Sequence, residues 1–235
     1  MTDLDAFLSS HLSRKGRIAN PRPGFYLILT TEDKASGAPD PARWIDALMK
    51  HQKIDYRVSL LTAAKLHGAA TESQSLQAIV PRELRDFAIG RHRIEFLTQP
   101  ANTFARTNRS EWLEELKTDT GAAKAAGIEL TLLDCARWFH KAGGISAAAA
   151  ITRELGAKAK AARLTTLARD YENSAVRRLG YLLELAGHEA QAKALDPFTE
   201  KAKMQLLDPT SKLEPTEMSG RWKIAVNTPL QPDSK

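Results

Sequence analysis

Cations are concentrated in one short stretch of this sequence, between residues 82 and 93. The stretch holds Arg82, Arg85, Arg91, His92 and Arg93. Guanidinium groups bind phosphate oxygens through paired N–H donors, so such a cluster is suited to the backbone of DNA or RNA. A solvated face of a β-sheet is the alternative interpretation, because exposed strands also carry charged side chains. The residues alone leave both interpretations open.

Two other groups of cations stand out. Lys15, Arg17 and Arg22 lie near the N-terminus, and Arg177 and Arg178 lie within S-A-V-R-R-L-G-Y-L-L-E-L-A-G at 174–187. The whole chain has 34 Lys and Arg against 28 Asp and Glu, a formal charge of +6. A basic balance of this size permits nucleic-acid binding and does not by itself require it.

Motifs for catalysis and metal binding are absent from the sequence. It contains no G-x-x-x-x-G-K-[ST] loop, no G-x-G-x-x-G, no H-E-x-x-H and no G-x-S-x-G. The six histidines are scattered, and the single cysteine excludes a cysteine-based zinc cluster. We therefore expect a protein that is not an enzyme and that uses no cofactor and no metal.

The sequence also indicates the cellular compartment of the protein. No run approaches 18 apolar residues, which argues against a membrane-spanning helix and a membrane partner. The first residues, M-T-D-L-D, lack the apolar segment of a signal peptide. Cys135 has no partner within the chain for a disulfide and fits a reducing compartment. The sequence predicts a cytoplasmic protein.

The N-terminal 40 residues have the pattern of a helix followed by a β-hairpin. Leu4, Phe7, Leu8 and Leu12 share one face of a helix over residues 2–15. Residues 17–19 and 25–29 are expected to be strands around a turn rich in Pro and Gly. A polar-faced helix with a basic hairpin is the end of a winged helix-turn-helix, in which the helix enters the major groove. An ordinary surface helix and hairpin fit the same residues.

From residue 41 the pattern predicts an α+β fold with a mixed, mainly antiparallel sheet. Asp40 is expected to cap a helix over 41–52, residues 56–58 to form a short edge strand, and Ser59 to begin a helix that Gly68 ends. His67 near the end of this helix is expected to be structural. Further strands are expected over 74–80, 85–89 and 91–98.

The C-terminal part is rich in alanine and predominantly helical. Helices are expected over 128–141, 146–155, 161–171, 174–186 and 188–195, with a further helical segment after Pro197 that ends by Leu206. Gly180 in mid-helix predicts a close backbone approach, and Asp134 is expected to be a buried hydrogen-bonding group. A last strand over 221–227 is expected to return to the sheet.

Two stretches carry a resemblance to a known family. I-E-L-T-L-L-D-C-A-R-W-F-H-K-A-G-G at 128–144 and the stretch at 174–187 resemble the AbiEi antitoxins of type IV toxin–antitoxin pairs. The resemblance runs from about Ser13 to the C-terminus. It implies a partial winged-helix element over 1–40, because two earlier helices of that element are missing, and an antitoxin domain over 41–235. It also implies a strand at 110–117, where the local pattern favours a helix.

The resemblance further implies an antitoxin that counters a nucleotidyltransferase-like (AbiEii-like) toxin without a stable complex and represses its own operon. An interaction domain that does not bind DNA, and engages a protein or RNA through the basic hairpin, is the alternative. The DNA contacts implied are Ser9, Ser10, Ser13, Arg14, Lys15, Arg17 and Arg22. By charge alone, the candidate antitoxin surface is Arg82, Arg85, Arg91, Arg93, Arg177 and Arg178.

Overall fold

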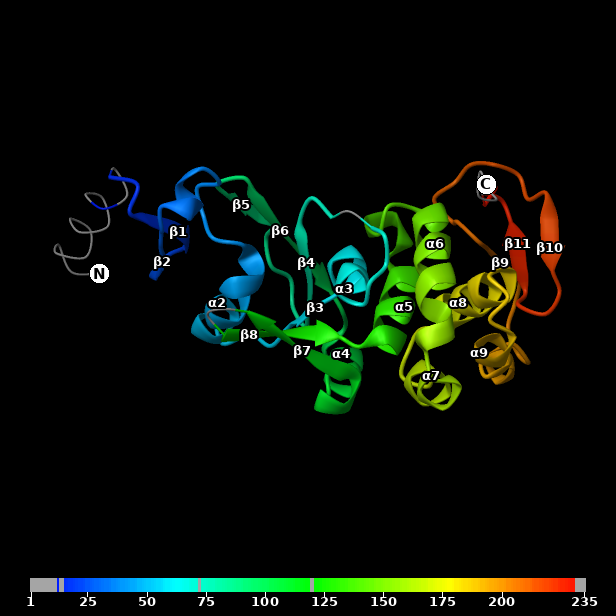
Figure 1. The fold of residues 1–235 in the computed structure, drawn as a ribbon. Helices are drawn as coiled ribbons and strands as arrows, with labels where there is room; N and C mark the ends of the chain where they lie inside the picture. Colours follow the sequence, from blue (N-terminus) through cyan, green and yellow to red (C-terminus); the bar gives the residue numbers. More distant parts are fainter. Residues whose placement is uncertain (1–11, 13–14, 72, 119–120, 231–235) are drawn as a thin grey trace. The chain divides into compact units, whose positions relative to one another are not determined.

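The computed structural model describes residues 12, 15–71, 73–118 and 121–230 (Figure 1). The chain forms two compact units. Unit 1 comprises residues up to 58 together with 73–101 and 114–125, and unit 2 comprises 59–72, 102–113 and 126–235. The chain therefore passes between the units five times. The division does not fall at residue 40, where the sequence predicts a domain boundary, because the N-terminal hairpin belongs to unit 1.

The hairpin of unit 1 consists of β1 (Ile18–Arg22) and β2 (Phe25–Ile28), which pair antiparallel. Both predicted strands are confirmed, and the turn between them contains Gly24 with a positive φ of 77°. Leu27 of β2 is 7% exposed and contributes to the hydrophobic core of the unit. The hairpin is thus packed onto the rest of unit 1.

A mixed six-stranded sheet forms the centre of unit 1. Its order is β5-β6-β4-β3-β8-β7. β3 pairs antiparallel with β4 and parallel with β8, while β6 pairs parallel with β4 and antiparallel with β5. The strands are β3 (Arg57–Val58), β4 (Leu76–Val80), β5 (Phe87–Ile89), β6 (His92–Thr98), β7 (Leu113–Thr118) and β8 (Gly121–Ala126).

Two predictions about this sheet have different outcomes. The edge position predicted for residues 56–58 is wrong, because β3 has a partner strand on each side and both of its residues are buried. Its shortness, which suggested an edge, reflects the start of a helix directly after Ser59. The strand implied by the resemblance at 110–117 is confirmed as β7, preceded by a short 3₁₀ turn at Ser110–Trp112.

Helix α2 (Ile45–His51) buries its apolar face in the core of unit 1. Ile45, Leu48 and Met49 are fully buried there with residues of β4 and β6. The expected cap is present, since the backbone N–H of Ala42 donates to Asp40 Oδ1 at 2.8 Å. This cap serves a 3₁₀ turn at Pro41–Arg43, and α2 follows it.

Unit 2 contains helices and a small sheet of its own. The core of the unit is formed where α5, α6 and α8 pack against one another (Figure 1). The helices are α3 (Leu60–Leu66), α4 (Ala101–Thr107), α5 (Ile128–Arg137), α6 (Ile145–Leu155), α7 (Ala161–Ala168), α8 (Asn173–Leu185) and α9 (Glu189–Lys193). No helix in the described part of the chain is long and apolar enough to cross a bilayer.

The end of the chain differs from the sequence prediction. Residues after Pro197 do not continue a helix to Leu206, and β9 (Gln205–Leu206) occurs there instead. The last strand, β11 (Ile224–Val226), does not return to the six-stranded sheet. It lies between β9 and β10 (Glu217–Ser219) in a separate three-stranded sheet. The reason is that the apolar residues of this segment are buried within unit 2, against α8.

Trp222 fixes the tail onto α8. Its side chain is fully buried, and its indole Nε1–H donates to Glu184 Oε2 at 2.6 Å. A Cβ on Gly180 of α8 would lie 2.5 Å from Cε3 of Trp222 and nearer still to Cζ3 and Cη2. The close approach predicted for Gly180 is thereby confirmed, and the approaching group is a tryptophan ring.

Asp134 joins three segments of unit 2. It is fully buried on α5 and accepts hydrogen bonds from Ser59 Oγ, at 2.5 Å, and from the hydroxyl of Tyr171. The predicted buried, hydrogen-bonding role is confirmed. His67 is also structural, since its Nε2 lies 2.8 Å from the carbonyl oxygen of Ala126.

The close packing at Gly180 leads to a prediction about stability that can be measured. Gly180→Ala improves helix propensity by about 1 kcal/mol but places a methyl group inside the Trp222 ring, and overpacking costs about 1–3 kcal/mol or more. We expect a net loss of stability and a melting temperature lower by roughly 5 °C, measured by circular dichroism. Gly220→Ala is the control, because a Cβ there meets no atom within 4 Å. A Gly180→Ala protein as stable as the control would contradict this packing.

Candidate functional site

The exposed cations of unit 1 are the first candidate site. Lys15, Arg17, Arg82, Arg85 and Arg91 are all exposed. Among the residues that the structure describes, none of the five has a carboxylate within ion-pair distance. Their charges are therefore available to a phosphate. Their assignment to DNA or to an antitoxin surface stays a prediction.

Two other cations of unit 1 are already engaged. Arg93 pairs with Glu95 at 3.0 Å and with Asp86 at 3.9 Å, which offsets its charge. The Arg22 guanidinium lies over the Phe87 ring, 4.1 Å from its centroid, and donates to the carbonyl oxygen of Arg85. Partial burial lowers the pKa of Arg22. Arg22 thus connects the β1–β2 hairpin to β5, instead of extending from a wing.

The loop before α2 is fixed to the same strand pair. The backbone N–H of Arg91 donates to the carbonyl oxygen of Ser36 at 2.7 Å, and His92 Nε2 lies 3.0 Å from the carbonyl oxygen of Ala38. The loop reaches the β5–β6 turn because Gly37 and Gly90 lack side chains; a Cβ on Gly90 would lie 2.8 Å from Gly37 Cα. The basic β5–β6 turn therefore has a fixed backbone.

The remaining predicted DNA contacts cannot be placed. Ser9, Ser10, Ser13 and Arg14 lie outside the described residues. The same holds for most of the helix expected over residues 2–15. The groove-reading helix consequently stays a prediction from the sequence.

Arg177 is buried, which corrects its assignment to an exposed surface. It is 5% exposed, and its Nη1 donates to the carbonyl oxygens of Lys203, Trp222 and Lys223 at 2.9, 3.2 and 3.0 Å. Nε and Nη2 donate to the side-chain oxygens of Asn173 and Gln205. Arg177 therefore holds the tail against α8 and is not accessible to a partner. The local sequence could not reveal this, because the covering segment lies more than 25 residues away.

Arg178 is likewise buried, at 5% exposure. Its Nε donates to the carbonyl oxygen of Leu207 at 2.8 Å and its Nη1 to that of Ala136 at 2.9 Å. The guanidinium also lies 4.8 Å from the Phe139 ring centroid. Burial lowers the pKa of Arg178 to about 10, so the group stays cationic at neutral pH. Arg178 is not part of an open basic surface, but it borders a cavity.

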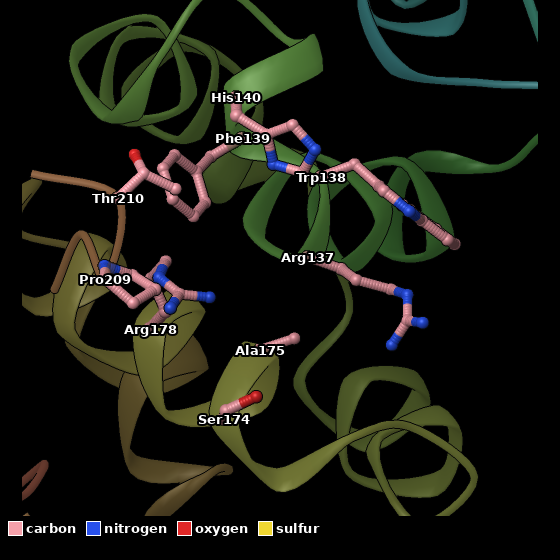
Figure 2. Close-up of a pocket in the computed structure, with 9 residues that line it drawn as sticks. All are labelled: Arg137, Trp138, Phe139, His140, Ser174, Ala175, Arg178, Pro209 and Thr210. Carbon is pink, nitrogen blue, oxygen red and sulfur yellow. The ribbon is translucent and has the colours of Figure 1, made fainter. Parts of the chain in front are cut away.

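This cavity, of about 350 Å³, lies within unit 2. The end of α5 and the 3₁₀ turn that follows it form one side, and the first turns of α8 form another (Figure 2). Its rim is open, since His140, Ser174, Pro209 and Thr210 are exposed. The lining residues are Arg137, Trp138, Phe139, His140, Ser174, Ala175, Arg178, Pro209 and Thr210.

Most of these lining residues were not predicted as site residues from the sequence. The sequence did contain an indication of these residues. The cavity lies where the stretches at 128–144 and 174–187 meet, and these two stretches carry the family resemblance. Ser174 was predicted as a helix cap. The helix begins one residue earlier, so Ser174 occupies its second position.

No group of three His, Cys, Asp or Glu residues suited to a metal ion occurs among residues 15–71, 73–118 and 121–230. Cys135 is buried and lies next to Asp134. Burial raises the pKa of its thiol well above the usual value, and the Asp134 charge adds to the effect. A thiol with a raised pKa is a poor nucleophile, so the described residues offer no cysteine-based chemistry.

Comparison with solved structures gives the fold. The crystal structure of the RV2827C protein from Mycobacterium tuberculosis superposes with a TM-score of 0.67 over 96% of this chain and 80% of the other, at 17% identity. No curated protein gives a significant match. The family model of the AbiEi antitoxin C-terminal domain matches residues 57–185, more than half of the chain. The chain belongs to the AbiEi antitoxin family. Its role is accordingly that of an antitoxin in a toxin–antitoxin system.

The AbiEi match includes residues of both units. It begins at β3 in unit 1 and ends at the last residue of α8 in unit 2. It includes the basic β5–β6 strands and most of the cavity lining, but neither the β1–β2 hairpin nor the tail. Both candidate sites thus have their main residues in the family domain.

The burial of Arg177 makes a second prediction. Arg177→Met keeps most of the volume but removes a donor from three carbonyl oxygens, of which, among the described residues, only that of Lys223 keeps a second one, from Gln205 N. We expect this to cost about 3 kcal/mol of unfolding free energy. Urea unfolding followed by circular dichroism measures this loss. Arg82→Met is the matched control, because an exposed cation should change stability by no more than about 0.5 kcal/mol. Equal stability of the two variants would show that Arg177 does not hold the tail.

Proposed function

We propose that this chain is the antitoxin of a type IV pair and that it counters a nucleotidyltransferase-like toxin in the cytoplasm without forming a stable complex with it. The AbiEi family match over residues 57–185 is the observation that carries this proposal.

We further propose that the protein represses its own operon by binding operator DNA. Five exposed cations of unit 1 with no ion-pair partner among the described residues support this proposal: Lys15, Arg17, Arg82, Arg85 and Arg91. Such charges release counterions from DNA and give a binding constant that falls steeply with salt. The N-terminal helix would recognise the DNA sequence of the operator, as the family resemblance implies.

A charge-removal experiment tests DNA binding. Arg82→Gln, Arg85→Gln and Arg91→Gln together remove three of the five cations, and we expect weaker binding to the region upstream of the gene. The slope of log Kobs against log salt should become shallower by about 0.9 for each phosphate that the variant no longer neutralises. Electrophoretic mobility shift over a series of salt concentrations measures both quantities.

The control for this experiment removes the same charge from unit 2. Arg169→Gln, Lys201→Gln and Lys212→Gln alter three exposed cations at a distance in sequence from the β5–β6 strands. This variant should bind DNA with a salt slope close to that of the unaltered protein. Equal loss in the two triple variants would mean that net charge, and not this surface, determines binding. Binding to RNA but not to DNA would favour the alternative function of a basic interaction domain.

Antitoxicity has a separate test. Expression of the chain should restore growth of cells that produce the nucleotidyltransferase-like protein of its operon, whereas affinity purification should recover no stoichiometric complex. The first triple variant should lose repression, and its ability to restore growth shows whether the same cations also serve antitoxicity. Failure of the unaltered chain to restore growth would refute the proposed function.

A further inference from the structure

Arg178 has one donor group that the protein does not use. Nε and Nη1 are bound to main-chain carbonyl oxygens, but Nη2 has no hydrogen-bond partner among the described residues. Figure 2 shows this guanidinium directed into the space between Phe139 and Ala175, whereas the Arg137 guanidinium points away from it. Arg178 Nη2 is not among the fully buried polar atoms that lack a partner, so it is open to the cavity and can donate to an anion there.

The N-terminus of α8 faces the same cavity. α8 has 13 residues, and Ser174 and Ala175 of its first turn line the cavity. Neither the hydroxyl nor the backbone N–H of Ser174 has a partner in the part of the chain that the structure describes. Free N–H groups and the helix dipole both favour an anion at this end. Ser174 and Arg178 are four residues apart, so they lie on one face of the helix.

The neighbouring carboxylates do not complete the site. Asp208 Oδ1 accepts bonds from Thr210 N, Thr210 Oγ1 and Ser211 N at 2.8, 2.6 and 3.2 Å. Glu172 forms an ion pair with Arg137. Neither carboxylate forms a hydrogen bond with Arg178 among the described residues. Asp208 is close enough to stabilise the charge of Arg178, yet the donors facing the cavity stay unused.

We propose that this cavity binds the phosphate group of a small phosphorylated molecule. A phosphate has three oxygens that can accept from Arg178 Nη2, the Ser174 hydroxyl and the Ser174 N–H together, whereas a carboxylate has only two. The volume of about 350 Å³ exceeds that of phosphate alone and leaves room for an attached group. Phe139 offers that group an apolar surface. This inference is independent of operator binding and of the toxin.

Calorimetric titration of the full chain tests the site, with inorganic phosphate and AMP as probes and adenosine and acetate for comparison. We expect inorganic phosphate and AMP to bind, AMP more tightly if the attached group also contacts the cavity. Adenosine should not bind, and acetate should bind at least about tenfold more weakly than phosphate. The absence of heat with both phosphorylated probes at millimolar concentrations would overturn the proposal, as would equal affinity for acetate or adenosine.

Ser174→Asp is the decisive variant. It places a carboxylate in the cavity while keeping α8 stable, because an acidic residue is favourable in the first turn of a helix. We expect the affinity for phosphate to fall by at least about tenfold through like-charge repulsion. Arg178→Lys should also weaken binding, since an ammonium group cannot keep both carbonyl contacts and extend a further donor.

Ser146→Asp is the matched control. Ser146 is exposed and is the second residue of α6, as Ser174 is of α8, but it does not line the cavity. Both variants change the net charge equally, and circular dichroism is used to check that both are folded. Affinity retained by Ser146→Asp and abolished by Ser174→Asp supports the site. An equal effect of the two substitutions would overturn it.

Discussion

The packing of Trp222 on Gly180 is the contact on which the rest of unit 2 depends. The ring occupies the space that any side chain at position 180 would need, so this packing requires glycine there. Arg177 donates to the carbonyl oxygens of Trp222 and Lys223, and Arg221 forms ion pairs with Glu184, Glu189 and Asp196. These polar contacts specify the register of the tail, and the apolar contact supplies the burial.

Buried polar groups fix how the segments of unit 2 pack together, and one of these groups also lines the candidate site. Asp134 is satisfied by two hydroxyls, and Arg177 by carbonyl and amide oxygens, so both charges are fully used inside the protein. Arg178 differs because one of its nitrogens faces a cavity. The unused charges of unit 1 are, in contrast, exposed on its surface. The proposed binding of nucleic acid and the proposed binding of a small anion therefore rest on different parts of the family domain.

Much of the fold follows from local sequence. Apolar spacing and capping residues predicted α5, α6 and α8 to within a few residues, and a glycine in mid-helix predicted a close contact at Gly180. The predictions that failed concern contacts between residues that are far apart in the sequence. The two residues of β3 do not encode their two partner strands, and nothing near Arg177 or Arg178 indicates that residues 203–207 and 222–223 would cover them. Of the candidate site, the exposed cations were predicted, whereas the cavity depends on two stretches that only folding brings together.

The five passages of the chain between the units have a consequence for how the protein is made and how it can be dissected. Unit 1 is complete only after residue 125 has been synthesised, and unit 2 requires Trp222. Neither unit can therefore fold fully when only the first hundred residues have left the ribosome. No single cut separates the units intact. Nested deletions would therefore report misfolding in place of function, and point substitutions are the means of testing the surface of one unit without unfolding the other.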